Sequence, residues 1–136
     1  MKKHEAHRNF DGDLSKVPEI RNWVIEQLID SRIAESVIGD IKIALSEALT
    51  NIYRHSYSNE IVKPVRIKVF INEDKIQITL RDFGKRFDLS NYKSPDMSQL
   101  SSNGFGIYMI HKLMDGVQYI PKEVGTELIM WKHIHE

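Results

Sequence analysis

The sequence contains no cysteine, and this absence excludes several kinds of protein at once. Without cysteine there is no disulfide framework, no cysteine-based zinc site and no thiolate nucleophile, and a cytoplasmic protein is the natural expectation. The seven glycines and four prolines of the 136 residues are not gathered into a linker that would divide the chain. We therefore expect one domain that covers residues 1–136.

An excess of charge of one sign is missing as well, because 19 Lys and Arg residues balance 19 Asp and Glu residues. Affinity for nucleic acids comes mainly from clustered basic residues, so this balance argues against a nucleic-acid partner. No apolar run approaches the roughly 20 residues that a membrane-spanning helix needs. The charged residues near the start also leave no place for the apolar region of a signal peptide. We expect no contact with a membrane.

Helical periodicity is present twice in the first half of the chain. A first helix is predicted to open at Ser15, its candidate N-cap, and to repeat apolar residues at helical spacing as far as Leu28. A second helix, about 30 Å long, is predicted over residues 36–57. Its continuous apolar face identifies it as the central element of the core.

The period then changes to two, which predicts a hairpin with strands over residues 65–71 and 76–80. Residues 90–103 are polar and rich in turn formers, so we expect a long loop there. A third helix is expected from residue 104 to about 114, and a second pair of strands over 117–120 and 127–131. This order favours an α+β fold, a two-layer sandwich with helices on one face of a mostly antiparallel sheet.

Three polar residues of the second helix recur at every fourth position, namely Glu47, Asn51 and His55. Residues at this spacing drift by about 40° per step and form one stripe beside the apolar face. Such a stripe is either a solvated surface with ordinary i,i+4 contacts or a row of ligand-binding groups. For His55 there is a further alternative, because a cation near a helix C-terminus interacts favourably with the helix dipole.

Asp82 shares the strand parity of the apolar residues before it, so its carboxylate is predicted to face the helices, where an unpaired charge is unfavourable. Its partner is either a neighbouring basic residue or the amino group of a ligand. Gly84 allows a tight turn two residues later. Thr126 begins the last strand in parity with Leu128, so we expect it to face the same interior as Asp82.

Two glycines, Gly104 and Gly106, stand where the third helix is predicted to begin. Free amide groups and the positive end of a helix dipole favour an anion at such a place, so this pair is a candidate phosphate cradle. The alternative is a flexible junction between loop and helix. The polar loop directly before it, residues 90–103, has the position of a lid over bound phosphates.

Taken together, four short segments resemble the ATP-binding superfamily shared by gyrase, histidine kinases and a large heat-shock chaperone. The segments are residues 47–55, Asp82-Phe83-Gly84, Gly104-Phe105-Gly106-Ile107 and Gly125-Thr126. The resemblance covers about residues 35–132. Within the superfamily, the short chain, the Glu-Ala-x-x-Asn motif and the Leu-Met-Asp segment at 113–115 are most similar to the bacterial anti-sigma-factor serine kinases.

The resemblance implies an ATP-dependent serine/threonine protein kinase that uses ATP and Mg²⁺. Glu47 would then be the general base that activates the substrate hydroxyl, and Asn51 would coordinate Mg²⁺ on the phosphates. Asp82, supported by Thr126, would accept a hydrogen bond from the adenine amino group. His55 is a candidate phosphate contact.

The glycines of the boxes also receive roles from the resemblance. Gly84 would let the backbone approach the base, and Gly104 and Gly106 would let the lid pack over the phosphates. The implied partners are an antagonist protein that is phosphorylated, a sigma factor or similar regulatory protein, and a second copy of the chain in a homodimer.

The chain departs from the family pattern at two places. Arg86 occupies the second glycine position of the adenine-side box, and residues 101–103 lack an arginine that many relatives carry there. These departures keep a second function open, a non-catalytic nucleotide-dependent protein-interaction module. A third alternative, the ATPase domain of a sensor histidine kinase, is disfavoured because no helix with a phosphoacceptor histidine precedes the boxes.

Overall fold

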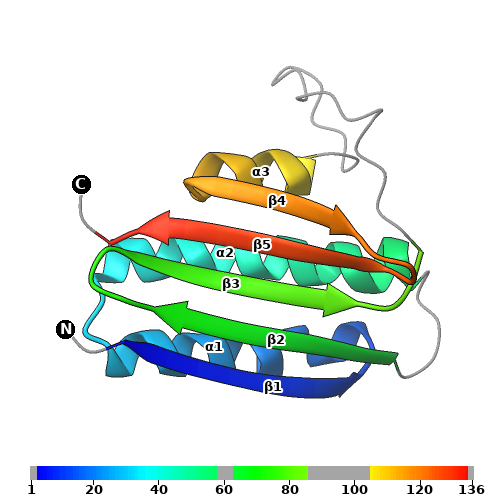
Figure 1. Cartoon of the computed structure of the whole chain (residues 1–136), viewed down its shortest axis with the longest axis horizontal. Coiled ribbons are helices and arrows are strands. Elements are labelled where there is room, and N and C mark those ends of the chain that lie inside the picture. Colours follow the sequence, from blue (N-terminus) through cyan, green and yellow to red (C-terminus); the bar gives the residue numbers. More distant parts are fainter. Residues whose placement is uncertain (1–2, 58–62, 86–104, 135–136) are drawn as a thin grey trace.

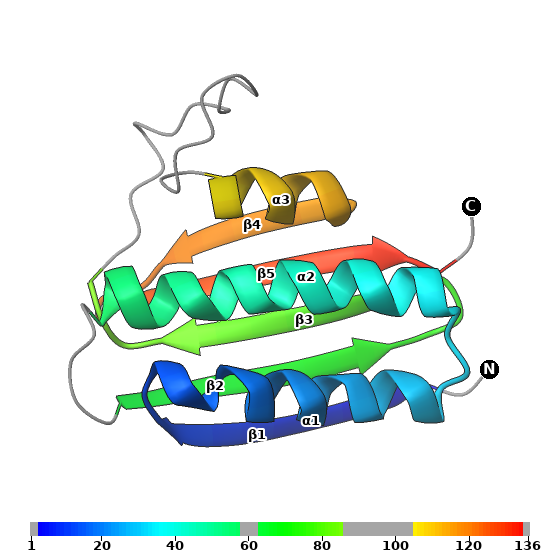
Figure 2. The same cartoon turned by 180° about the vertical axis from the view of Figure 1, so that it is seen from behind.

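The computed structural model describes residues 3–57, 63–85 and 105–134, which form a five-stranded sheet with helices on one face (Figures 1 and 2). The predicted α+β fold is confirmed. The elements are β1 (His4–Gly12), a 3-10 turn (Leu14–Lys16), α1 (Val17–Asp30), α2 (Glu35–Asn51), a π-helical turn (Ile52–Ser56), β2 (Lys63–Ile71), β3 (Lys75–Asp82), α3 (Phe105–Leu113), β4 (Gly116–Pro121) and β5 (Thr126–His133).

The strands lie in the order β1-β2-β3-β5-β4, and every neighbouring pair is antiparallel. Both predicted hairpins, β2–β3 and β4–β5, are therefore confirmed. The second strand of the C-terminal hairpin lies against β3, so the end of β3 meets the beginning of β5. In this register Asp82 pairs with Thr126.

The N-terminal strand β1 was not predicted, and the structure corrects the sequence analysis here. In β1 only Phe10 is a large apolar residue facing the helices, so the strand lacks the alternation that reveals β2 and β3. Charged and polar residues are typical of an edge strand, because they discourage pairing with other chains. His4 Nε2 in this strand forms a hydrogen bond of 2.8 Å with Gln27 Oε1 of α1.

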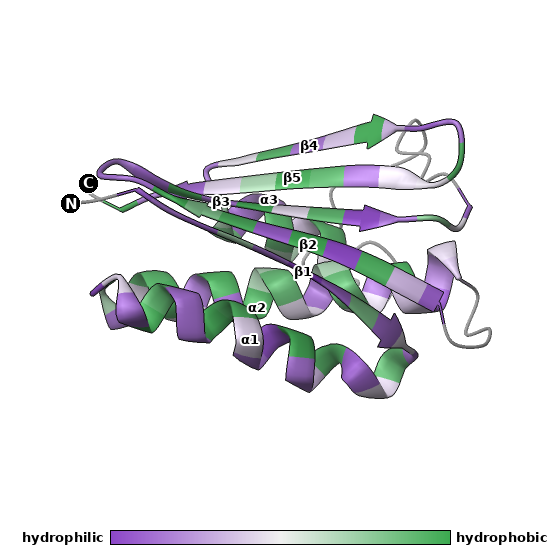
Figure 3. Cartoon of the chain, turned by 60° about the horizontal axis from the view of Figure 1, so that its bottom comes forward, coloured by the Kyte–Doolittle hydropathy of each residue, from purple (hydrophilic) through white to green (hydrophobic). Residues whose placement is uncertain are grey.

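The core lies between the sheet and the two long helices (Figure 3). Residues of β2 and β3 alternate between buried apolar positions and the open face of the sheet. As predicted, α2 is the central helix, with Ile41, Ala44, Leu45, Ala48 and Leu49 buried. Each large aliphatic side chain buried in this way contributes roughly 1.5–3 kcal/mol. No helix in the described ranges is both long and apolar enough to cross a membrane.

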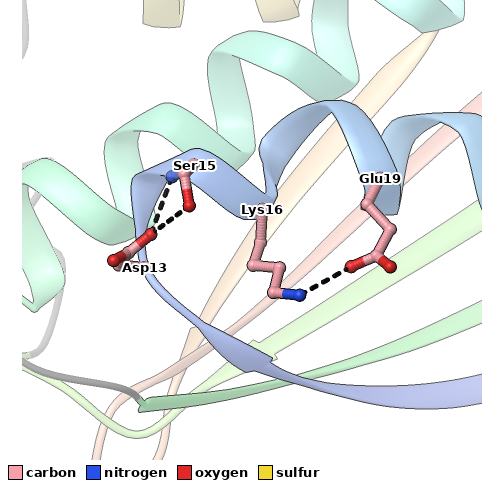
Figure 4. Close-up of polar contacts among 4 residues, drawn as sticks. All are labelled: Asp13, Ser15, Lys16 and Glu19. Carbon is pink, nitrogen blue, oxygen red and sulfur yellow. Dashed lines mark hydrogen bonds and ion pairs between the residues drawn. The ribbon is translucent and has the colours of Figure 1, made fainter.

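The start of α1 differs from the prediction that Ser15 caps it. Asp13 is the N-cap of the short 3-10 turn, and its carboxylate accepts hydrogen bonds from the Ser15 backbone at 2.9 Å and the Ser15 hydroxyl at 2.5 Å (Figure 4). The same hydrogen bonds lower the pKa of Asp13. Helix α1 itself begins at Val17 without a side-chain cap.

The long predicted helix is continuous to Ser56 but changes geometry after Asn51. The Tyr57 backbone N–H donates to the Ile52 carbonyl at 2.9 Å, which is the i→i+5 pattern of a π-helical turn. In such a turn the residue five positions on, rather than four, comes to lie above a given residue. Ser56 is accordingly buried, whereas His55 is exposed and leaves the stripe of Glu47 and Asn51.

Candidate functional site

Apart from tyrosines, three polar residues are buried in the described part of the chain, and all three line one hollow. Their exposed fractions are 6% for Ser56, 4% for Asp82 and 2% for Thr126. They come from the π-helical turn, the end of β3 and the start of β5. The rest of the lining is Ala48, Asn51, Ile52, Tyr119 and Leu128. Because buried polar groups are unfavourable unless they are satisfied, their concentration here marks a candidate binding site.

Asp82 supplies the charge of this hollow. Burial raises the pKa of its carboxyl group, while hydrogen bonds from the Gly84 and Thr126 backbones and the nearby Arg81 charge oppose the rise. The Gly84 N–H donates to Asp82 Oδ1 at 3.0 Å. Arg81 donates to the backbone carbonyl of Asp82 rather than to its side chain. No ion pair of Asp82 exists within the described ranges, and the ligand amino group stays a prediction.

Thr126 lies beside Asp82, as the strand parity predicted. Its position depends on Gly125, which has a φ of +77°, a conformation that other residues rarely adopt. A Cβ atom at Gly125 would lie only 2.2 Å from the backbone oxygen of Asp82. The glycine of this fourth box therefore allows the turn before β5 to close onto the end of β3.

Gly84 brings the chain after β3 against the π-helical turn. A Cβ atom at Gly84 would lie 2.2 Å from the Ser56 carbonyl oxygen, which accepts a hydrogen bond from the Lys85 N–H at 2.9 Å. The structure thus gives Gly84 a packing role that the sequence did not predict. Its expected closeness to a bound base stays a prediction.

Tyr57 also connects the π-helical turn to the chain after β3, through its side chain. The hydroxyl of this buried residue donates to the Pro64 carbonyl at 2.6 Å and accepts from the Phe83 N–H at 2.8 Å. One side chain therefore connects the end of the π-helical turn, the beginning of β2 and the residue after Asp82. These two hydrogen bonds hold the three segments together beside the hollow.

Asn51 is half-buried in the last turn of α2 and lines the hollow. An amide oxygen is a suitable ligand for Mg²⁺, which takes one or two protein groups and otherwise binds waters and phosphates. No group of three or more His, Cys, Asp or Glu side chains that could hold a metal occurs in the described ranges. A cation at Asn51 would thus depend on ligands from a bound phosphate.

Glu47 lies one turn earlier on α2, about 6 Å along the helix axis. It does not line the hollow but contacts the first turn of α3, where a Cβ atom at Gly106 would lie 2.6 Å from Glu47 Oε2. A carboxylate is favourable near a helix N-terminus. The fold therefore brings the predicted general base next to Gly106, which is the one glycine of the predicted phosphate cradle within the described residues.

Of the remaining predicted residues, the structure describes only His55, and this residue does not join the arrangement. His55 is exposed and is not among the lining residues. Gly104, Arg86 and the loop 90–103 lie outside the described residues. Ser56 and Tyr119 also line the hollow but were not predicted. A change from α to π geometry leaves no signal in helical spacing, so the sequence does not reveal that Ser56 faces the site. For Tyr119 in β4, the alternation of buried and exposed positions is weak.

Comparison with known proteins places these observations in a family. Residues 10–132 match the family described as the histidine kinase-like ATPase domain. Serine-protein kinase RsbW from Oceanobacillus iheyensis is 34% identical over 143 aligned positions, which cover 94% of this chain and 90% of that protein. Serine-protein kinase RsbW from Bacillus cereus is 38% identical over 71% of this chain, but the match spans only 64% of that relative's length.

A solved structure shares the fold. The crystal structure of the RsbU and RsbW domains of Rv1364c from Mycobacterium tuberculosis aligns with a TM-score of 0.71 over 95% of this chain and 31% of that one. The sequence identity is 17%, so this likeness concerns the fold alone. The match over residues 10–132 and the relatives above together show that the chain belongs to the histidine kinase-like ATPase domain family and, within it, to the proteins named serine-protein kinase RsbW.

Proposed function

We propose that this chain is an ATP-binding regulatory protein that acts as a serine/threonine kinase of the anti-sigma-factor type. The observation that carries the proposal is the hollow in which Ser56, Asp82 and Thr126 gather beside Asn51. The names of the relatives support the kinase activity.

The hollow suits the edge of an adenine base better than a whole ring. It encloses about 20 Å³ of free space, roughly the room that one water molecule or one amino group needs. An ionised Asp82 only accepts hydrogen bonds, so it selects a donor such as the adenine amino group. Ala48, Ile52 and Leu128 supply apolar surface for the ring beside this edge.

The order of residues along α2 fits a nucleotide that extends away from the hollow. Ile52 is next to the base site, Asn51 is the candidate Mg²⁺ ligand, and Glu47 stands beside Gly106 at the start of α3. Bound Mg²⁺ supplies charge neutralisation on the transferred phosphoryl group. Glu47 would accept the proton of the attacking seryl hydroxyl, while the start of α3 favours the phosphate charge.

The proposed partners are an antagonist protein that is phosphorylated and a sigma factor or similar regulatory protein, with a homodimer as the proposed assembly. They rest on the family resemblance. Sedimentation equilibrium of the purified chain tests the assembly, because a mass of one chain at micromolar concentration would contradict the dimer.

Titration calorimetry with ATP, ADP and GTP, each with and without Mg²⁺, tests nucleotide binding. We expect adenine-selective binding that Mg²⁺ strengthens, and a weaker Mg²⁺ effect in Asn51→Ala. Absence of binding by the folded protein would overturn the proposal.

Transfer is tested separately, with the antagonist protein of an RsbW relative as phosphate acceptor. Glu47→Gln should abolish transfer but keep ADP affinity, and Glu26→Gln, on an exposed part of α1, is the matched control. Binding without any transfer by the unchanged chain would favour the non-catalytic interaction module, to which the Arg86 departure also points.

A further inference from the structure

Ser56 is the buried polar residue of the hollow for which the family pattern quoted above supplies no role. Its backbone position is fixed, because its carbonyl accepts from the Lys85 N–H and packs against Gly84, where even a Cβ atom would clash. The π-helical turn directs Ser56, rather than His55, toward the hollow. Within the described ranges, the Ser56 hydroxyl makes no hydrogen bond.

The chemistry of the hollow is incomplete with Asp82 alone. An adenine amino group is flanked by ring nitrogens, N1 on one side and N7 on the other, and these only accept hydrogen bonds. An ionised carboxylate cannot donate to them, whereas a serine hydroxyl both donates and accepts. The Thr126 backbone N–H already donates to Asp82. The Ser56 hydroxyl, on a buried residue that lines the hollow, can supply such a donor.

We propose that Ser56 is a specificity-determining residue whose hydroxyl donates to the ring nitrogen beside the amino group held by Asp82. This inference rests on the proposed adenine site and deepens it. Asp82 of β3 would then accept from the amino group, and Ser56 of the π-helical turn would donate to the ring nitrogen at the same edge of the base. Guanine carries a carbonyl oxygen in place of the adenine amino group, so it would offer no donor to Asp82 and would not satisfy both residues.

The test compares Ser56→Ala with the unchanged protein and with the control Ser46→Ala. Ser46 is also a serine of this helical segment, but its hydroxyl donates to the Lys42 carbonyl at 2.8 Å outside the hollow. Binding of ADP, 1-deaza-ADP and 7-deaza-ADP is measured by calorimetry, and the thermal midpoint of each variant checks folding. The two analogues each lack one of the flanking ring nitrogens.

We expect Ser56→Ala to bind ADP about three- to tenfold more weakly, the effect of one neutral hydrogen bond. With one of the two deaza analogues, the variant and the unchanged protein should bind equally, because the acceptor is gone. A purely structural role would weaken all three ligands alike and would overturn the inference. So would ADP affinity equal to that of Ser46→Ala. If the unchanged protein binds no ADP, the proposed function itself is overturned.

Discussion

At the residue scale, the buried carboxylate of Asp82 serves the proposed adenine binding but lowers the stability of the folded protein. Its carboxylate is buried at the junction of β3 and β5, and burial raises its pKa above the ordinary 3.8. The folded protein therefore binds this proton more tightly than the unfolded chain does. The contribution of this proton to the free energy of unfolding is fully present below the pKa of the unfolded state and is lost as the pH rises through the pKa of the folded state. At neutral pH the buried charge of Asp82 therefore lowers the free energy of unfolding.

Asp82→Asn should accordingly raise the thermal midpoint of the nucleotide-free protein at pH 7, since a neutral amide avoids the burial of charge. The amide oxygen can still accept from the Gly84 N–H. The same change should reduce the preference for ATP over GTP. Thermal unfolding followed by circular dichroism, and calorimetry with both nucleotides, check the two effects. A lower midpoint together with unchanged preference would contradict both assignments.

Tyr53 gives a second prediction at this scale. Its hydroxyl is buried without a hydrogen-bond partner among the described residues, and burial raises its pKa to about 12. Tyr53→Phe removes the unsatisfied group and should stabilise the protein by about 1 kcal/mol in urea unfolding at pH 7.

The same hydroxyl sets a response to alkaline pH. Stability from the neutral phenol is complete below the unfolded pKa of 10.0 and is lost as the pH rises toward about 12. Tyr53→Phe should lose less stability across this window than the unchanged protein. An equal loss would mean that other groups dominate.

At the scale of elements, two glycines of helices provide a matched comparison. A Cβ atom at Gly39 in α2 would meet nothing within 4 Å, so Gly39→Ala should stabilise the protein by up to about 1 kcal/mol. At Gly106 in α3 the same atom would press on Glu47. Gly106→Ala should leave the helical content unchanged but lower the rate of phosphate transfer, which a radiolabel assay measures. If Gly39→Ala and Gly106→Ala transfer phosphate at the same rate, the closeness of Glu47 to the start of α3 does not matter for transfer.

The elements also show what sequence reasoning could reach. Strong periodicity revealed α2, β2 and β3, and strand parity alone placed Asp82 and Thr126 on one interior face. The edge strand β1 was not predicted, because an edge strand needs few apolar residues and so shows no clear alternation. Ser56 was not predicted because helical spacing does not reveal a change to π geometry, and Gly84, against which Ser56 packs, lies far away in the chain.

At the scale of the whole molecule, the candidate site joins segments that are far apart in the chain. Asn51, Asp82 and Thr126 are brought together when β3 pairs with β5 and α2 packs on the sheet. A ligand bound there has no counterpart in the unfolded chain and should stabilise the fold as a whole.

Saturating ADP with Mg²⁺ should therefore raise the thermal midpoint, by the equivalent of about 2.7 kcal/mol when the ligand is at 100 times its Kd. Chelation of Mg²⁺ should remove part of this shift, and GTP should produce little of it. A scan by differential fluorimetry measures all three conditions. An equal shift with GTP would argue against recognition of the adenine edge.

The polar edge strand β1 has a consequence for biosynthesis. Its first residue, His4, pairs with Ile71 of β2, although α1 and α2 lie between them in the chain. On the ribosome β1 is made before β2, and at ordinary elongation rates the interval between the two strands is on the order of several seconds. During that interval an apolar strand would be a template for aggregation. The same charged and polar side chains that concealed β1 from periodicity should therefore disfavour association of the nascent chain before β2 is made.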